Sequence, residues 1–144
     1  MPSLPGRAII REVGLRDGLQ SIARTLPTAQ KIEWLRAAHA AGQREIEVGS
    51  FVPAKLLPQL ADTAEIVAWA RTIPGLHVAA LVPNFKGALA AVEAGAHKIT
   101  LPLSASESHS LKNLRRTHAQ VLEEAQRIGE LLRSLPVGRR PCFE

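Results

Sequence analysis

An arginine and an aspartate stand side by side at Arg16 and Asp17, directly before Gly18 and soon after the apolar run Ala8-Ile9-Ile10. Such a run predicts a buried strand of a parallel sheet, and α/β folds place their reactive side chains at the carboxyl ends of these strands. A carboxylate there offers a hard oxygen ligand, which suits Mg²⁺ or Mn²⁺ better than a soft metal. An ordinary surface pair in a glycine-containing turn is the alternative that the tripeptide alone leaves open.

Short apolar segments alternate with helical patterns along the whole chain, which is typical of successive βα units in a parallel sheet. Their content of Ile, Val, Leu and Ala fits strands that are covered on both faces. We expect strands at Ala8–Val13, Glu45–Val48, His77–Leu81 and Lys98–Leu101, and Pro141–Glu144 as the opening of a fifth.

The helices between these strands are predicted from periodicity and from their end signals. They are expected at Thr28–Ala41, from Asp62 onward, at Lys86–Ala94 and from Thr117 to Leu135. Gly42 and Gly95 should end the first and third helices in the left-handed conformation. Asp62 with Glu65, and Thr117 with Gln120, have the spacing of capping boxes.

The composition excludes several classes of protein. No apolar run approaches the roughly 20 residues that span a bilayer, and the amino end lacks the apolar segment of a secretory signal, so we expect a cytoplasmic protein without a membrane anchor. Cys142 is the one cysteine, which excludes an internal disulfide. The net charge is +5, but the basic residues are scattered and aromatics are few, which argues against a nucleic-acid partner.

Two pairs of arginines, Arg115-Arg116 and Arg139-Arg140, account for part of the positive charge. They are interpreted either as solvated surface or as groups that attract an anionic substrate such as an acyl-CoA. His109 is interpreted as a solvated loop histidine.

Four stretches of the chain resemble, in order, the motifs of the hydroxymethylglutaryl-CoA lyase family, which belongs to a superfamily of metal-dependent TIM-barrel lyases and Claisen-type synthases. The stretch Glu12–Gln20 is similar to the family's signature after the first strand. The other three are Ile46–Pro53, Val82–Gly87, and Pro102–Glu107 with Lys112-Asn113.

The resemblance implies an α/β fold, the (β/α)₈ TIM barrel, of which this chain supplies about the first four βα units and the start of strand five. Residues 1–144 are then the N-terminal half of one catalytic domain, with 1–7 as a disordered lead-in. Since such a barrel typically needs about 250 residues, the chain looks truncated. Strands one and four would be unpaired edges, so we expect self-association or a polypeptide that supplies the missing C-terminal half.

The resemblance also implies roles for individual residues. Arg16 is expected to face the substrate carbonyl and stabilise an enolate, and Glu47 to position that arginine, because a buried carboxylate needs a cationic neighbour. Asp17 is implied as a ligand of Mg²⁺ or Mn²⁺. The family's other ligands, a His-x-His pair and an asparagine, have no counterpart here, so metal binding should be weak. The residues implied to line the substrate pocket are Gln20, Ser50 and Asn84.

The reaction implied is a metal-assisted retro-Claisen cleavage of 3-hydroxy-3-methylglutaryl-CoA to acetyl-CoA and acetoacetate, with the chain inactive alone. Cys142 lacks the flanking glycines of the family's proton donor and is interpreted as a packing residue. Leu15 and Ser21-Ile22 depart from the family pattern, which leaves open a lyase or synthase for a related 3-hydroxy acyl-CoA of citramalyl type. A non-catalytic half-barrel that serves assembly or binding is the other alternative.

Overall fold

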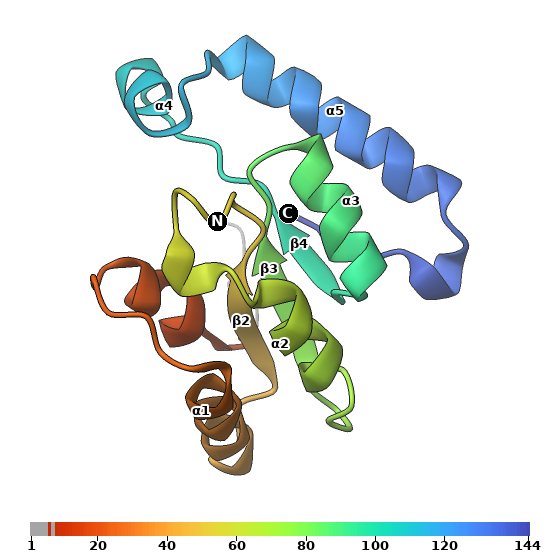
Figure 1. The fold of residues 1–144 in the computed structure, drawn as a ribbon. Helices are drawn as coiled ribbons and strands as arrows, with labels where there is room; N and C mark the ends of the chain where they lie inside the picture. Colours follow the sequence, from red (N-terminus) through yellow and green to blue (C-terminus); the bar gives the residue numbers. More distant parts are fainter. Residues whose placement is uncertain (1–5, 7) are drawn as a thin grey trace.

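The computed structural model describes Gly6 and residues 8–144, and these form one parallel sheet (Figure 1). The strands lie in their sequence order, and each pairs in parallel with the next. They are β1 (Arg11–Glu12), β2 (Glu45–Ser50), β3 (His77–Leu81), β4 (Lys98–Thr100) and β5 (Cys142–Phe143). The predicted α/β class is confirmed, whereas the expected lead-in at 1–7 lies outside the described residues apart from Gly6.

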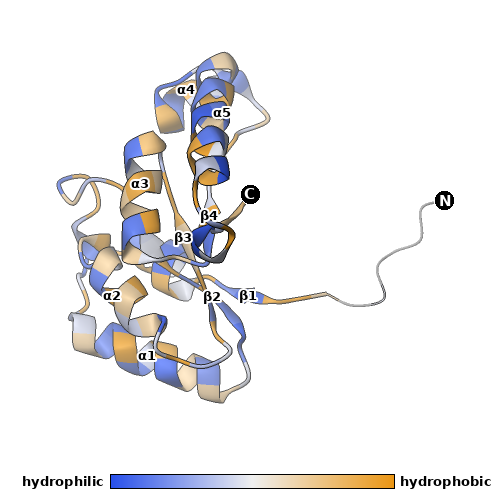
Figure 2. Ribbon diagram, turned by 90° about the vertical axis from the view of Figure 1, so that its right-hand side faces the viewer, coloured by the Kyte–Doolittle hydropathy of each residue, from blue (hydrophilic) through white to orange (hydrophobic). Residues whose placement is uncertain are grey.

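Five helices connect the strands: α1 (Thr28–Ala40), α2 (Thr63–Ala70), α3 (Phe85–Ala94), α4 (Glu107–Leu114) and α5 (His118–Ser134). Helix α2 contacts α1 and α3, and α3 contacts α5. Figure 2 shows α1, α2 and α3 on one side of the sheet, as repeated crossovers of one hand require. Among the described residues, no helix is long and apolar enough to cross a membrane.

The two faces of the sheet have opposite chemical character. Ile46 and Val48 of β2 are at most 2% exposed and belong to the apolar core beneath the helices. Because side chains alternate along a strand, Glu45 and Glu47 project to the other face. Strand β4 repeats the pattern, with Ile99 in the core and Lys98 ion-paired to Glu45 on the far side. We call this far side, which carries Arg11, Glu45, Glu47, Lys98 and Thr100, the inner face.

Several predicted end signals are confirmed. Gly42 follows α1 with φ 100°, and Gly95 follows α3 with φ 86°, so both adopt the left-handed conformation that favours glycine. Thr117 and Gln120 form the predicted capping box at the start of α5, with both hydrogen bonds present.

The predicted capping box at Asp62 is wrong. Asp62 does occupy the position before α2, but its side chain makes no capping hydrogen bond. Its carboxylate instead accepts from Lys31 Nζ at 2.5 Å and from Thr28 Oγ1 at 2.8 Å. Lys31 is only 2% exposed, and leaving a buried ammonium without a carboxylate costs more free energy than leaving a helix end without a side-chain cap.

Four further expectations need correction. The first strand is shorter than predicted, and Ile9 and Ile10 are 75% and 74% exposed instead of buried; in Figure 2 this hydrophobic segment stands clear of the helices. Strand β4 is not an edge, because β5 pairs with it. The segment after β4 contains α4, so His109 lies exposed on a helix and not on a loop. Cys142 is exposed and is therefore not a packing residue.

Candidate active site

A single π-helical turn, Gly14–Gly18, connects β1 to the rest of the chain and orients the Arg-Asp pair. The turn is fixed at its start, where the Arg16 and Asp17 amides donate to the Val13 carbonyl at 3.1 and 2.8 Å. Leu15 anchors the turn to the apolar core, where its side chain is only 1% exposed. At Gly14 a Cβ would lie 2.6 Å from the Trp34 ring, so only glycine fits there.

Glu47 lies on the inner face of β2 with its carboxylate between two guanidinium groups. Arg16 Nε donates to Glu47 Oε1 at 2.5 Å, and Arg11 Nη1 lies 3.8 Å from Glu47 Oε2. The glutamate side chain is 3% exposed, and the two arginines are 19% and 21% exposed. The prediction that Glu47 is buried beside a cation is confirmed, and the pair fixes the arginine that follows β1.

Asp17 differs from Glu47 in being open to solvent. Its side chain is 63% exposed, and its Oδ1 accepts from Arg16 Nη1 at 2.9 Å. In residues 8–144 and Gly6, no three His, Cys, Asp or Glu side chains gather closely enough to hold a metal ion. A hard cation such as Mg²⁺ needs several oxygen ligands, so these residues alone do not form a complete metal site. Asp17 offers one ligand at most.

Ser50 ends β2 on the inner face because the strand contains a bulge. The register shifts between Glu47 and Gly49, and a Cβ at Gly49 would collide with Thr63 on α2, so position 49 faces the helices and Ser50 faces away. The Ser50 amide donates to Thr63 Oγ1 at 3.1 Å. Its own hydroxyl is buried without a hydrogen-bond partner among the described residues, which is costly for a polar group.

Gln20 and Asn84 are not joined to this group. Gln20 is exposed just beyond the π-helical turn. Asn84 caps α3, with Oδ1 accepting from the Gly87 amide at 2.9 Å. Within the described part of the chain, no hydrogen bond connects either residue to Arg16 or Glu47. The structure thus brings Arg16, Asp17 and Glu47 into one connected group, with Ser50 on the same face of β2.

A charged network on the inner face was not predicted from the sequence. Arg11 Nε donates to Glu45 Oε1 at 2.6 Å, Lys98 Nζ to the same carboxylate at 2.9 Å, and Arg11 also pairs with Glu144. The hydrogen bond to Glu144 raises the pKa of Arg11. Burial opposes ionisation of Glu45, but hydrogen bonds from Lys98 and Arg11 outweigh it and hold the pKa of Glu45 below its ordinary value. The available signal was the alternation of polar residues with apolar ones, at Glu45 and Glu47 and at Lys98 and Thr100.

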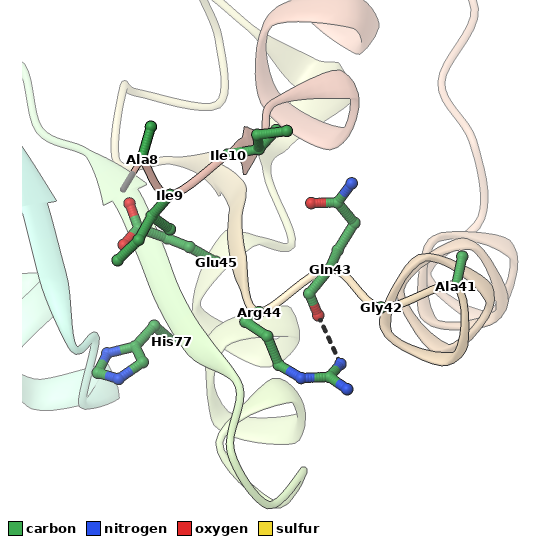
Figure 3. Close-up of a pocket in the computed structure, with 9 residues that line it drawn as sticks. All are labelled: Ala8, Ile9, Ile10, Ala41, Gly42, Gln43, Arg44, Glu45 and His77. Carbon is green, nitrogen blue, oxygen red and sulfur yellow. Dashed lines mark hydrogen bonds between the residues drawn. The ribbon is translucent and has the colours of Figure 1, made fainter. Parts of the chain in front are cut away.

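Cavities lie at both ends of the sheet. A cavity of about 390 Å³, drawn in Figure 3, lies at the amino ends of the strands, lined by Ile9, Ile10, Gln43, Arg44 and His77 among others. This cavity is at the opposite end of the sheet from the candidate site, because Arg16 and Asp17 follow the carboxyl end of β1 and Ser50 ends β2. A second cavity of about 350 Å³ follows the carboxyl end of β4, lined by Leu103, Ser104, Ala105, His118 and Leu122.

A parallel sheet with helices on one side, and an arginine paired to a buried carboxylate at its carboxyl edge, has the arrangement of a segment of an α/β barrel. Comparison with known proteins gives the family. The HMGL-like family model matches residues 7–137, and the chain therefore belongs to that family.

The similar proteins are lyases of hydroxymethylglutaryl-CoA (HMG-CoA). The chain is 44% identical over 112 residues to the 3-hydroxy-3-isohexenylglutaryl-CoA/hydroxymethylglutaryl-CoA lyase of Pseudomonas aeruginosa, covering 78% of this chain and 37% of that protein. It is 39% identical to the mitochondrial hydroxymethylglutaryl-CoA lyase of Bos taurus over 132 residues, 92% of this chain and 40% of that protein. A similar lyase of Mus musculus is cytoplasmic. The chain thus spans about 40% of the length of these relatives.

Solved structures give the same result. The HMG-CoA lyase of Acinetobacter baumannii, in complex with coenzyme A and 3-methylmalate, superposes with a TM-score of 0.82 at 39% identity, covering 94% of this chain and 43% of that one. The lyase of Pseudomonas aeruginosa superposes with a TM-score of 0.82 at 41% identity, covering 90% and 43%. The five parallel strands with their helices match the TIM barrel of these lyases over that share.

Proposed function

We propose that this chain contributes the Arg16–Glu47 part of the active site of a carbon–carbon lyase that cleaves 3-hydroxy-3-methylglutaryl-CoA to acetyl-CoA and acetoacetate. The observation that supports it most is the 2.5 Å bond from Arg16 Nε to the buried Glu47 carboxylate, in a chain of the HMGL-like family. Membership in the HMGL-like family supports the class of reaction, and the guanidinium that Glu47 holds in place supports a role for Arg16 in that reaction. We further propose a cytoplasmic location, as for the mouse relative.

Arg16 has the geometry of an enolate-stabilising group. Its Nε is bound by Glu47 and its Nη1 by Asp17, which leaves Nη2 without an acceptor among the described residues. A base, proposed to lie outside the described residues, takes the proton of the 3-hydroxyl as the bond between C2 and C3 breaks, so that C3 becomes the ketone carbon of acetoacetate. The electron pair of that bond moves to the thioester oxygen of an enolate, which then gains a proton at C2 to give acetyl-CoA. A guanidinium held in place beforehand stabilises that oxygen without reorganisation as the charge develops.

Asp17 is proposed as one ligand of Mg²⁺ or Mn²⁺, with the remaining ligands supplied from outside the described residues. A bound divalent cation would polarise the substrate oxygens. Within this chain the part of Arg16 is to orient the Asp17 carboxylate, through the 2.9 Å contact between Nη1 and Oδ1. Because one carboxylate cannot hold such a cation tightly, we propose that the 144-residue chain alone does not cleave the substrate.

The substrate is proposed to be an acyl-CoA. A relative of known structure holds coenzyme A and 3-methylmalate, which supports a ligand of this kind. The buried Ser50 hydroxyl, which has no hydrogen-bond partner in the part of the chain that the structure describes, is proposed to bind a substrate oxygen. Gln20 is exposed beside the π-helical turn and is proposed to contact the acyl chain at the mouth of the site, as is the amide nitrogen of Asn84, whose oxygen is used in capping α3.

A longer acyl group is a second candidate. The relative from Pseudomonas aeruginosa that is 44% identical is named for 3-hydroxy-3-isohexenylglutaryl-CoA as well as for HMG-CoA. A ratio of kcat/KM for the two substrates decides between them, because even one added methylene in an apolar pocket changes that ratio by about 10–200-fold.

A chimaeric enzyme tests the proposed activity. Residues 1–144 replace the matching segment of the Pseudomonas aeruginosa lyase, and acetoacetate release from HMG-CoA is measured with Mg²⁺. We expect the chimaera to be active, the 144-residue chain alone to be inactive, and Arg16→Gln to lower kcat about 10²–10³-fold, the usual effect of removing one oxyanion donor. Arg24→Gln, at an exposed position outside the site, is the matched control. A folded chimaera in which Arg16→Gln equals the control contradicts the proposal.

The open edges of the sheet support a further part of the proposal, that the chain pairs with additional strands from a second copy or from the rest of a barrel. Ile9 and Ile10 are 75% and 74% exposed beside β1, which is an edge of the sheet. We expect the isolated chain to self-associate with rising concentration in light-scattering measurements, and Ile9→Lys with Ile10→Lys to suppress this. A monomer at all concentrations contradicts pairing between copies.

A further inference from the structure

The arginine pair Arg139-Arg140 has no part in the proposed lyase site. It precedes β5, at the amino edge of the sheet, whereas Arg16 and Ser50 lie at the carboxyl edge. Around it lies a cavity of about 380 Å³, formed where three βα units meet: the segments before β3, before β4 and before β5. We call it the basic pocket; its charged and imidazole side chains are Arg71, His77, Glu93, His97, Lys98, Arg139 and Arg140.

The positive charge of the basic pocket is not neutralised by neighbouring acids. Arg71, Arg139 and Arg140 have no carboxylate within 4.0 Å in the part of the chain that the structure describes. Glu93 is the one acid in the lining. Lys98 is different, because its ammonium is already paired with Glu45 at 2.9 Å. Three guanidiniums without a carboxylate partner and one carboxylate in the same lining give the cavity a net positive potential, which concentrates anions.

Two of these arginines are held in position. Arg140 Nη2 donates to the carbonyls of Arg133 and Leu135 at 2.9 and 3.1 Å, at the end of α5. Arg71 packs its guanidinium against Gly95, where any Cβ would collide with it. Gly95 thus serves both the left-handed turn after α3 and the placement of Arg71. Groups fixed before a ligand arrives lose less conformational entropy on binding it.

His97 adds a neutral donor. Its Nδ1 accepts from the Val78 amide at 3.1 Å, so in the neutral ring the proton is on Nε2. Burial, together with the charges of Arg71 and His77, lowers the pKa of His97. An anion beside Arg71 would offset that repulsion, which makes the titration of His97 a reporter of binding.

We infer that the basic pocket binds a phosphate group, through Arg71, Arg139 and Arg140. Planar guanidiniums match the oxygens of phosphate in pairs, and an imidazole N–H supplies a further donor. The lining contains no Phe, Trp or Tyr on which a nucleotide base could stack, so the phosphate itself is the group recognised. The site lies at the opposite end of the sheet from Arg16 and does not depend on the proposed lyase activity.

The test is titration of the 144-residue chain with inorganic phosphate at constant ionic strength, by calorimetry and by the NMR signals of His97. We expect saturable binding and a rise in the pKa of His97. Arg71→Gln with Arg139→Gln should weaken the affinity about tenfold or more, and Arg139→Gln alone, at an exposed position, by a smaller factor. ADP in place of phosphate distinguishes the source: tighter binding of ADP indicates a nucleotide phosphate, and equal binding indicates free phosphate.

Arg24→Gln is the control, because it removes the same charge from an exposed site outside the pocket. It should leave phosphate affinity unchanged. Equal weakening by Arg24→Gln and Arg139→Gln would mean that only the net charge of +5 attracts the anion, and the inference would be wrong. The absence of saturable binding in both the phosphate and the ADP titrations would overturn it as well.

Discussion

Replacement of Glu47 by glutamine tests the electrostatics of the candidate site. The side chain is 3% exposed, with Arg16 Nε 2.5 Å from one oxygen and Arg11 Nη1 3.8 Å from the other. Loss of one partner of a buried ion pair costs about 3–5 kcal/mol, and an amide of the same shape keeps one acceptor for Arg16. We therefore expect Glu47→Gln to lower the free energy of unfolding by about 2–3 kcal/mol.

Urea unfolding followed by circular dichroism measures this change, with Glu33→Gln as the control because Glu33 is exposed and unpaired among the described residues. A double-mutant cycle with Arg16→Met should give a coupling energy of at least about 1.5 kcal/mol. If Glu47→Gln costs no more than Glu33→Gln, or if the two sites are additive within about 0.5 kcal/mol, then Glu47 does not hold Arg16 in solution.

Three other outcomes follow from the same structure. Ser50→Ala should leave the free energy of unfolding in urea unchanged or slightly higher, since the hydroxyl has no partner among the described residues, and should lower kcat/KM of the chimaera. A decrease in the free energy of unfolding of more than about 1 kcal/mol would show that the hydroxyl has a partner. The pKa values of Glu45 and Glu144 are held below their ordinary value of 4.5, so the stability that these two carboxylates contribute is complete above about pH 4.5 and is lost as the pH falls through the lowered folded-state values. Arg11→Met should flatten this pH dependence of the free energy of unfolding. An equally steep curve would contradict the network. Mg²⁺ or Mn²⁺ at millimolar concentration should not raise the melting temperature of the isolated chain, and a rise abolished by Asp17→Asn would show a tighter site than the one carboxylate explains.

The arrangement of strands and helices follows from local signals in the sequence. The β3 segment was predicted with its observed bounds, because a short apolar run between a Gly-containing turn and a helical pattern favours a strand. The end of α3 at Gly95 and the start of α5 at the Thr117–Gln120 capping box could also be predicted, because each signal depends only on residues that are close together in the sequence. Helix α4 was missed because it is short and has only two apolar residues, Leu111 and Leu114, on which to recognise a helical pattern.

Only some of the contacts in the candidate site could be predicted from the sequence. Proximity of Arg16 to Glu47 could be expected, since both were placed at the carboxyl ends of neighbouring strands. The use of Asp62 by Lys31 could not, because it depends on how α1 packs against the segment before α2. The same holds for Arg11, whose partners Glu45 and Glu144 are distant in sequence and meet only through strand register.

The most direct measurement is the effect of Arg16→Lys on kcat and KM of the chimaeric lyase. Lysine keeps the positive charge, but as a point charge on a flexible stem, whereas the planar guanidinium binds Glu47 through Nε and Asp17 through Nη1 and leaves Nη2 for the proposed contact with the thioester oxygen. We predict a fall of about 10²-fold or more in kcat with KM changed only a few-fold, because the interaction forms as the enolate charge develops. An unchanged kcat with a raised KM would show instead that Arg16 only binds substrate.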